Sequence, residues 1–157
     1  MTDEMKIMKA QQAYLTLCCS LDEDNWKYLK KEESYAVVYR ETGNDLPMDC
    51  WLCIDAKRQL VRFLSTLPVD MKAADKMVEA AVACCIANST VAYGGFDLDI
   101  ATGKVHFRMT YAIKDGVVGK DFFRNMRSFA TSVIDSYNDK FALLAQGKMK
   151  ATDFFDV

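Results

Sequence analysis

Cys50 and Cys53 are separated by two residues, which is the spacing of a redox pair or of half a metal site. In redox proteins such a pair lies at the start of a helix, where the helix dipole lowers the pKa of a thiol. The residues around Cys50 predict a strand instead, and residues three apart on a strand point to opposite faces. We interpret Cys50 as a core residue and place Cys53 on the face of Trp51. A thiol redox sensor or enzyme using Cys50 and Cys53 is the alternative hypothesis.

The other four of the six cysteines form two adjacent pairs, Cys18-Cys19 and Cys84-Cys85. Adjacent cysteines rarely bridge each other, because the intervening peptide would be strained. A zinc site needs four ligands, and the chain has one histidine, so we expect neither a metal nor another cofactor. The N-terminus lacks an export signal, which predicts free thiols in a cytoplasmic protein.

Asp97 and Asp99 alternate with apolar residues, as a pair of carboxylates for metal binding or acid–base catalysis could. In a hairpin, however, they would lie near His106 and Arg108 on the facing strand. Opposite charges across a strand pair stabilise a hairpin. We therefore predict structural ion pairs here, no catalytic residues, and a protein that is not an enzyme.

Length, composition and charge indicate the number of domains and the classes of partner. The chain has 157 residues, of which 51% are hydrophobic and 27% charged, so it can bury a core. We expect one domain over residues 1–157, with a core of about 5–147 and a tail at 148–157. A net charge of −2 and a pI of about 5.4 argue against nucleic-acid binding. No apolar run approaches the roughly 18 residues that a membrane span needs.

The periodicity of apolar residues predicts the elements that position these side chains. Helices are expected over 4–22, from Asp70 to about Asn88, and over 120–144. Strands are expected over 35–41, 49–54 and 59–66, followed by a hairpin of 96–100 and 105–111 that turns at Gly103. The segment 26–33 is ambiguous. The order helix–three strands–helix–two strands–helix predicts an α+β fold, with one antiparallel sheet packed against helices.

The middle helix is predicted to bury one apolar face. That face consists of Ala74, Met77, Val78, Ala81, Val82, Cys85 and Ile86. Its many alanines would let the helix lie close to a neighbour, including one on another chain.

Several short motifs share their order and spacing with a known family. They are Leu67-Pro68 before the middle helix, Asn88 at its end, Gly95–Asp99 in the fourth strand and Gly103–Arg108 around the last turn. In these features the chain, over about residues 5–147, resembles the YbjN family, also described as bacterial sensory transduction regulators. The resemblance implies a type III secretion chaperone-like fold, frequent dimerisation and binding to other proteins. It implies no enzymatic activity.

The predicted sheet carries apolar residues on both faces, so part of one face could stay exposed as an interaction site. We predict a non-enzymatic bacterial protein-binding module, chaperone-like or a regulatory adaptor, that forms a homodimer and binds an extended segment of another protein. Tyr39, Trp51 and Phe63 are the candidate partner-binding residues. A small-molecule-binding regulator is a further alternative.

Overall fold

The computed structural model of the protein describes residues 2–44, 46–113 and 116–155. Its α-helices are α1 (Asp3–Glu23), α2 (Met77–Asn88) and α3 (Lys120–Ala145), and two short 3-10 helices are η1 (Glu32–Ser34) and η2 (Ala151–Phe155). The strands are β1 (Tyr28–Lys31), β2 (Ala36–Thr42), β3 (Pro47–Asp55), β4 (Leu60–Thr66), β5 (Gly95–Leu98) and β6 (Val105–Ala112). All six join one antiparallel sheet in the order β1-β2-β3-β4-β6-β5. The predicted α+β class is confirmed.

Strand β1 resolves the segment that the sequence left ambiguous. Its four residues pair with β2, from Tyr28 opposite Tyr39 to Lys31 opposite Ala36. Lysines suit a strand at the edge of a sheet, because their charges discourage pairing with a further strand. The same charges diluted the alternation by which a strand is recognised in the sequence.

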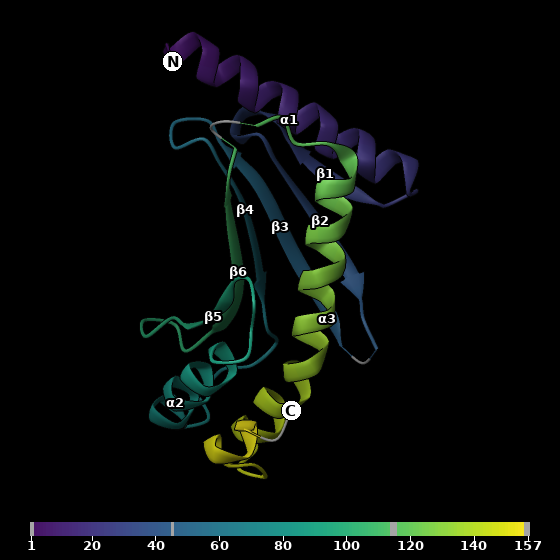
Figure 1. Ribbon diagram of the computed structural model, residues 1–157. Helices are drawn as coiled ribbons and strands as arrows, with labels where there is room; N and C mark the ends of the chain where they lie inside the picture. The colour runs from purple at the N-terminus through teal and green to yellow at the C-terminus, as the bar shows by residue number, and fades with distance from the viewer. Residues whose placement is uncertain (1, 45, 114–115, 156–157) are drawn as a thin grey trace.

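The helices pack against one face and the two ends of the sheet (Figure 1). α3 crosses the inner face, α1 lies across one end, and α2 and η2 lie together at the other end. The core on this side is built largely from fully buried aromatic rings. The ring of Phe96 on β5 lies 5.1 Å from that of Phe107 on β6 and 5.2 Å from that of Phe141 on α3.

The structure corrects the prediction for the middle helix in two ways. Asp70 does not cap it, since its carboxylate accepts hydrogen bonds from the backbone N–H groups of Lys72 and Ala73 in a turn. The helix itself begins later, at Met77. Its buried residues are Ala80, Ala83, Cys84, Ile86 and Ala87. Most of the face predicted to be buried therefore points to solvent, because α2 contacts β5 and η2 through its alanine-rich side.

The other two helices follow their predicted spans closely. In α1, Ile7, Met8 and Leu15 are exposed, and the first turns project past the strands (Figure 1). In α3 the buried face includes two polar residues, Arg127 and Asn138. Periodicity of apolar residues alone does not detect such buried polar positions.

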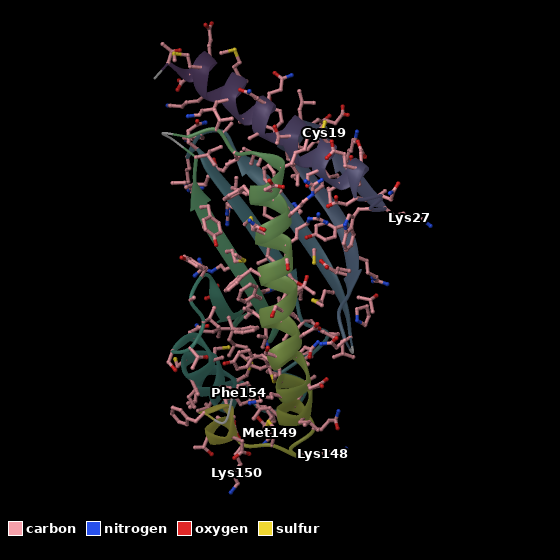
Figure 2. The ribbon with its side chains drawn as sticks, turned by 45° about the vertical axis from the view of Figure 1, so that its right-hand side comes forward. Cys19, Lys27, Lys148, Met149, Lys150 and Phe154 are labelled. Carbon is pink, nitrogen blue, oxygen red and sulfur yellow. The ribbon has the colours of Figure 1, made fainter. Side chains whose placement is uncertain are left out.

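The tail docks on the core as the short helix η2. Phe154 is fully buried, with its ring 4.9 Å from that of Phe141 and 6.1 Å from that of Tyr137. The neighbouring Phe155 is 67% exposed. Phe154 lies at the end of the molecule where α2 meets the end of α3 (Figure 2). The tail thus completes the core at this end.

Candidate functional site

The three predicted partner-binding residues do not share one surface. Tyr39 and Phe63 lie on the inner face of the sheet and are 3% and 2% exposed, so the prediction that they contact a partner is corrected. Trp51 lies on the outer face and is half-buried. The alternation along each strand identified two faces, but which face meets the helices depends on tertiary packing.

Around Trp51, the outer face carries a line of apolar side chains that runs across the strands. Trp51 on β3 pairs with Val38 on β2 and with Leu64 on β4, and Val38 pairs with Leu29 on β1. We call Leu29, Val38, Trp51 and Leu64 the outer apolar row. Leu29 is 66% exposed, and the other three are half-buried. Sequence reasoning missed the row because it needs the register of all four strands, including β1.

A polar row lies beside it on the same face. Arg40 on β2 forms an ion pair with Asp49 on β3, at 2.7 Å between Nε and Oδ1. Asp49 pairs with Thr66 on the next strand, β4, and Thr66 Oγ1 lies 2.8 Å from His106 Nδ1 on β6. These groups satisfy one another across the strands, so the polar row is a stabilising feature of the sheet.

Of the two hairpin carboxylates, one forms the predicted ion pair and the other holds the turn instead. Asp97 pairs with Arg108 across β5 and β6, with 3.3 Å between Oδ1 and one guanidinium nitrogen. Asp99 instead shapes the turn, because its carboxylate accepts hydrogen bonds from the Ala101 N–H and the Thr102 hydroxyl. Gly103 follows with φ of +74°, a conformation that favours glycine.

The thiols of Cys50 and Cys53 lie in surroundings that suppress their reactivity. Cys50 and Cys53 are 2% and 6% exposed, on opposite faces of β3 as predicted. Burial raises the pKa of the Cys50 thiol to about 12 and that of Cys53 to about 11. A redox or catalytic cysteine requires a lowered pKa, so these values argue against the thiol hypothesis. Among the described residues, no group of three or more His, Cys, Asp and Glu side chains could hold a metal ion.

The outward side of α2 forms a second exposed apolar surface. Val78, Ala81, Val82 and Cys85 are spaced by three and four residues, and we call them the α2 stripe. Val78 is 75% exposed and Val82 45%. Since the opposite side of α2 is also apolar, the helix has the composition of one buried all round. The stripe is therefore a candidate interface.

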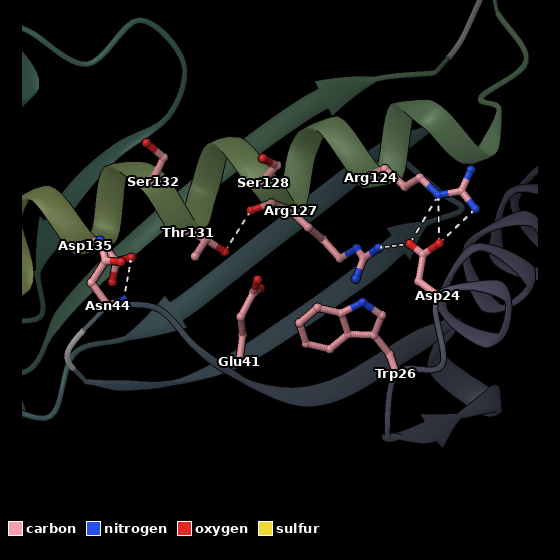
Figure 3. A pocket seen from close by; sticks show the side chains of 10 residues that line it. All are labelled: Asp24, Trp26, Glu41, Asn44, Arg124, Arg127, Ser128, Thr131, Ser132 and Asp135. Atoms are coloured by element: carbon pink, nitrogen blue, oxygen red, sulfur yellow. Dashed lines mark hydrogen bonds and ion pairs between the residues drawn. The ribbon is translucent and has the colours of Figure 1, made fainter.

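A polar cleft of about 470 Å³ opens between α3 and the sheet (Figure 3). The Arg127 guanidinium is 5% exposed, lies 4.9 Å from the Trp26 ring and donates to Asp24 at 2.8 Å. Asp24 also accepts from Arg124. Asp24 thus compensates both arginines and ties the end of α1 to α3. The carboxylates of Glu41 and Asp135 also line the cleft.

Similarity to known proteins is found in the three-dimensional structure but not in the sequence as a whole. No protein-family model and no curated protein sequence matches the chain. Of the solved structures, the ExsC–ExsE complex matches with a TM-score of 0.64 and 11% identity, over 84% of this chain and 95% of that chain. The HopA1–SchA chaperone–effector complex matches with a TM-score of 0.59 and 12% identity, over 82% and 95%.

E. coli YbjN matches with a TM-score of 0.56 and 14% identity, over 81% of this chain and 92% of that chain. The chain has the type III secretion chaperone-like fold. This confirms the fold implied by the sequence resemblance. One of the matching structures is a chaperone–effector complex, and another is the complex of ExsC with ExsE. At these identities the likeness establishes the fold of this chain.

No described helix is both long and apolar enough to cross a membrane.

Proposed function

We propose that the protein is a bacterial, non-enzymatic binding module, chaperone-like or a regulatory adaptor, that holds an extended segment of a protein partner. The observation that carries the proposal is the outer apolar row, a line of large side chains on the sheet face opposite α3. Exposed apolar patches of this kind usually mark interaction sites. The structural likeness to a chaperone in complex with an effector supports the same proposed function.

The charges around the outer apolar row narrow the chemistry of the partner. On the side away from the polar row, Lys31 on β1 and Arg62 on β4 are exposed on the same face, with β2 and β3 between them. A segment with apolar side chains and an acidic flank complements this surface.

The six cysteines are all free, which is typical of a protein in a reducing compartment. We therefore propose that the protein is located in the cytoplasm.

The experiment is affinity capture of the tagged protein from its host, followed by identification of the partner by mass spectrometry. The double variant Trp51→Ala/Leu64→Ala should lose the partner at least tenfold in affinity, because both changes remove area from the centre of the row. Ile100→Ala, at a 78% exposed residue outside the row, is the matched control. Unchanged binding by the double variant would overturn the proposed surface.

We further propose that the protein is a homodimer that pairs through the α2 stripe. The stripe is uncharged and apolar, and a two-fold axis would bring the same surface of two copies together. Its small side chains allow the two helices to approach closely. Val82→Asp should convert the dimer to a monomer in sedimentation equilibrium, whereas Val117→Asp, at a 79% exposed residue of a loop, should leave it unchanged. A wild-type protein that is monomeric at high micromolar concentration would contradict this.

A further inference from the structure

The inner side of the molecule has an aromatic pocket that neither proposed interface uses. It has a volume of about 450 Å³ and lies between α3, β6 and the turn after α2. Its lining residues are Tyr93, Tyr111, Phe122, Asn125, Met126 and Phe129. Tyr111 is paired with the buried Val61, so the pocket opens on the face opposite the outer apolar row.

Four rings form an arc around this pocket. The ring of Phe129 lies 5.8 Å from Tyr93, edge to face, and Tyr93 lies 6.2 Å from Tyr111. Tyr111 in turn lies 5.5 Å from Phe122, again edge to face. Phe122 and Phe129 are two turns apart on α3, with Met126 between them, so the arc is open where its two ends face each other. A ring bound in the pocket would be surrounded by aromatic rings, which pack favourably edge to face.

The lining determines the chemistry of the occupant. None of the six side chains is charged, so a cationic ligand would lose its hydration without gaining a counter-charge. Attraction between a cation and the ring faces is weaker than the gain from burying a whole apolar ring. A neutral aromatic group therefore fits the pocket better than an ammonium group.

The surroundings favour an aromatic group carried by a polypeptide. A second hollow of about 240 Å³ shares Phe129 with the pocket and continues along α3 past Val133 towards Tyr137. This hollow is also lined by uncharged residues. It offers a path for the chain that leads away from a ring held in the pocket.

We propose that the aromatic pocket is an anchor site for one aromatic side chain of the bound partner. This inference rests on the proposed function, since it assumes that the partner is a polypeptide. The partner then contacts both faces of the sheet, with an extended segment on the outer apolar row and an aromatic anchor beside α3.

The test uses the full chain labelled with ¹³C at the methionine methyl groups and N-acetyl-L-phenylalanine amide as the probe. The Met126 signal is assigned with Met126→Leu. The probe should shift this signal saturably, because an aromatic ring beside the methyl group changes its shielding. N-acetyl-L-alanine amide and N-acetyl-L-lysine amide should leave the signal unmoved at the same concentrations.

Tyr93→Ala should weaken binding of the probe at least tenfold, and Tyr93→Phe should keep it within about threefold. Tyr93 is 60% exposed, so neither change should unfold the protein, which a thermal melt verifies. An unmoved Met126 signal, or equal binding by Tyr93→Ala, would overturn the anchor site.

The two proposals fail in different ways. Trp51→Ala should not affect the probe, because Trp51 lies on the other face. If partner binding depends on Trp51 and the probe leaves Met126 unmoved, the anchor site is wrong and the proposed function stands. If the probe binds but capture yields no protein partner, the proposed function is wrong, and with it the polypeptide part of this inference.

Discussion

Glu41 on β2 is a carboxyl group whose surroundings oppose its charge. Burial raises its pKa above the ordinary value of 4.5, and the nearby Asp135 carboxylate adds to the rise, while Arg127 offsets part of it. A pKa raised by folding means that the ionised group destabilises the fold above that pKa. The penalty disappears as the pH falls through the folded-state pKa towards 4.5.

Glu41→Gln should therefore raise the melting temperature at pH 7 and have no effect below pH 4.5. Glu79→Gln is the matched control. Hydrogen bonds from its own backbone N–H and from Lys76 lower the pKa of Glu79, so its removal should reduce stability at pH 7. Thermal melts of the three proteins between pH 4 and pH 8 make the comparison. Destabilisation by Glu41→Gln at pH 7 would show that Arg127 outweighs burial.

The thiols give a second prediction at the residue scale. In native protein, a disulfide reagent should modify Cys19 rapidly, because Cys19 is exposed on α1. Cys85 should react rapidly only in the Val82→Asp variant, because the proposed dimer covers it. Cys18, Cys50, Cys53 and Cys84 are buried and should react only on unfolding. Mass spectrometry of the labelled sites is the measurement, and early labelling of Cys50 would revive the thiol hypothesis.

Among the elements, α2 packs on β5 and is also hydrogen-bonded to it through one side chain. Asn88, the last residue of α2, accepts a hydrogen bond from the Phe96 N–H at 2.7 Å and donates to the Phe96 carbonyl at 3.0 Å. The amide thus pairs with the free edge of β5 as a neighbouring strand would. A Cβ atom at Gly95 would lie 3.0 Å from the Asn88 Oδ1 atom, which explains why a residue without a side chain precedes Phe96.

Asn88→Ala should lower the free energy of unfolding by about 1–2 kcal/mol, because two hydrogen bonds are lost. Asn88→Asp should not restore it, since a carboxylate cannot donate to the Phe96 carbonyl. Urea denaturation provides both values. Equal stability of wild type and Asn88→Ala would mean that water replaces the amide without loss.

The packing of η2 against the core leads to a further prediction about the elements. Phe154→Ala should destabilise the protein by about 3–5 kcal/mol, the usual cost of removing a buried aromatic ring. Phe155→Ala, at the exposed neighbour, should change stability by no more than about 0.5 kcal/mol. Urea denaturation distinguishes the two, and similar effects of both changes would contradict the docked position of the tail.

Across the whole molecule, an ion-pair network joins segments about one hundred residues apart. Glu23 and Asp24 at the end of α1 bind Lys120, Arg124 and Arg127 at the start of α3. The hydrogen bond from Arg124 is the main reason that the pKa of Asp24 lies below its ordinary value of 3.8. Asp24 therefore stabilises the fold above that pH, and its contribution is lost as the pH falls through the folded-state pKa.

Asp24→Asn should lower the melting temperature at pH 7 more than Asp121→Asn does. Both carboxylates pair with Arg124, but only Asp24 also pairs with the buried Arg127, which the change would leave without its counter-charge. The gap between Asp24→Asn and wild type should close at low pH. A smaller effect of Asp24→Asn than of Asp121→Asn at pH 7 would show that the network does not hold α1 to α3.

Local patterns were sufficient for much of this structure. Alternation over 96–100 and 105–111 predicted the hairpin, and Gly103 its turn, although β5 ends at Leu98 and Ile100 is exposed. The repeated aromatic residues after Lys120 predicted α3, and the shared motifs predicted the fold that the solved structures confirm. Such features depend on residues close together in the chain, so periodicity and turn chemistry report them directly.

Tertiary packing decided which surfaces remain for binding. Alternation does not indicate which face of a strand meets the helices, and so Tyr39 and Trp51 looked equivalent although one is buried and the other faces outward. A helix that is apolar on every side, such as α2, has no preferred face until β5 and η2 pack against it. The sequence alone therefore determined most of the elements and the buried position of Cys50, but it placed Cys85 in the core where the structure buries Cys84 instead. The candidate surfaces exist only because residues far apart in the chain are brought into one register.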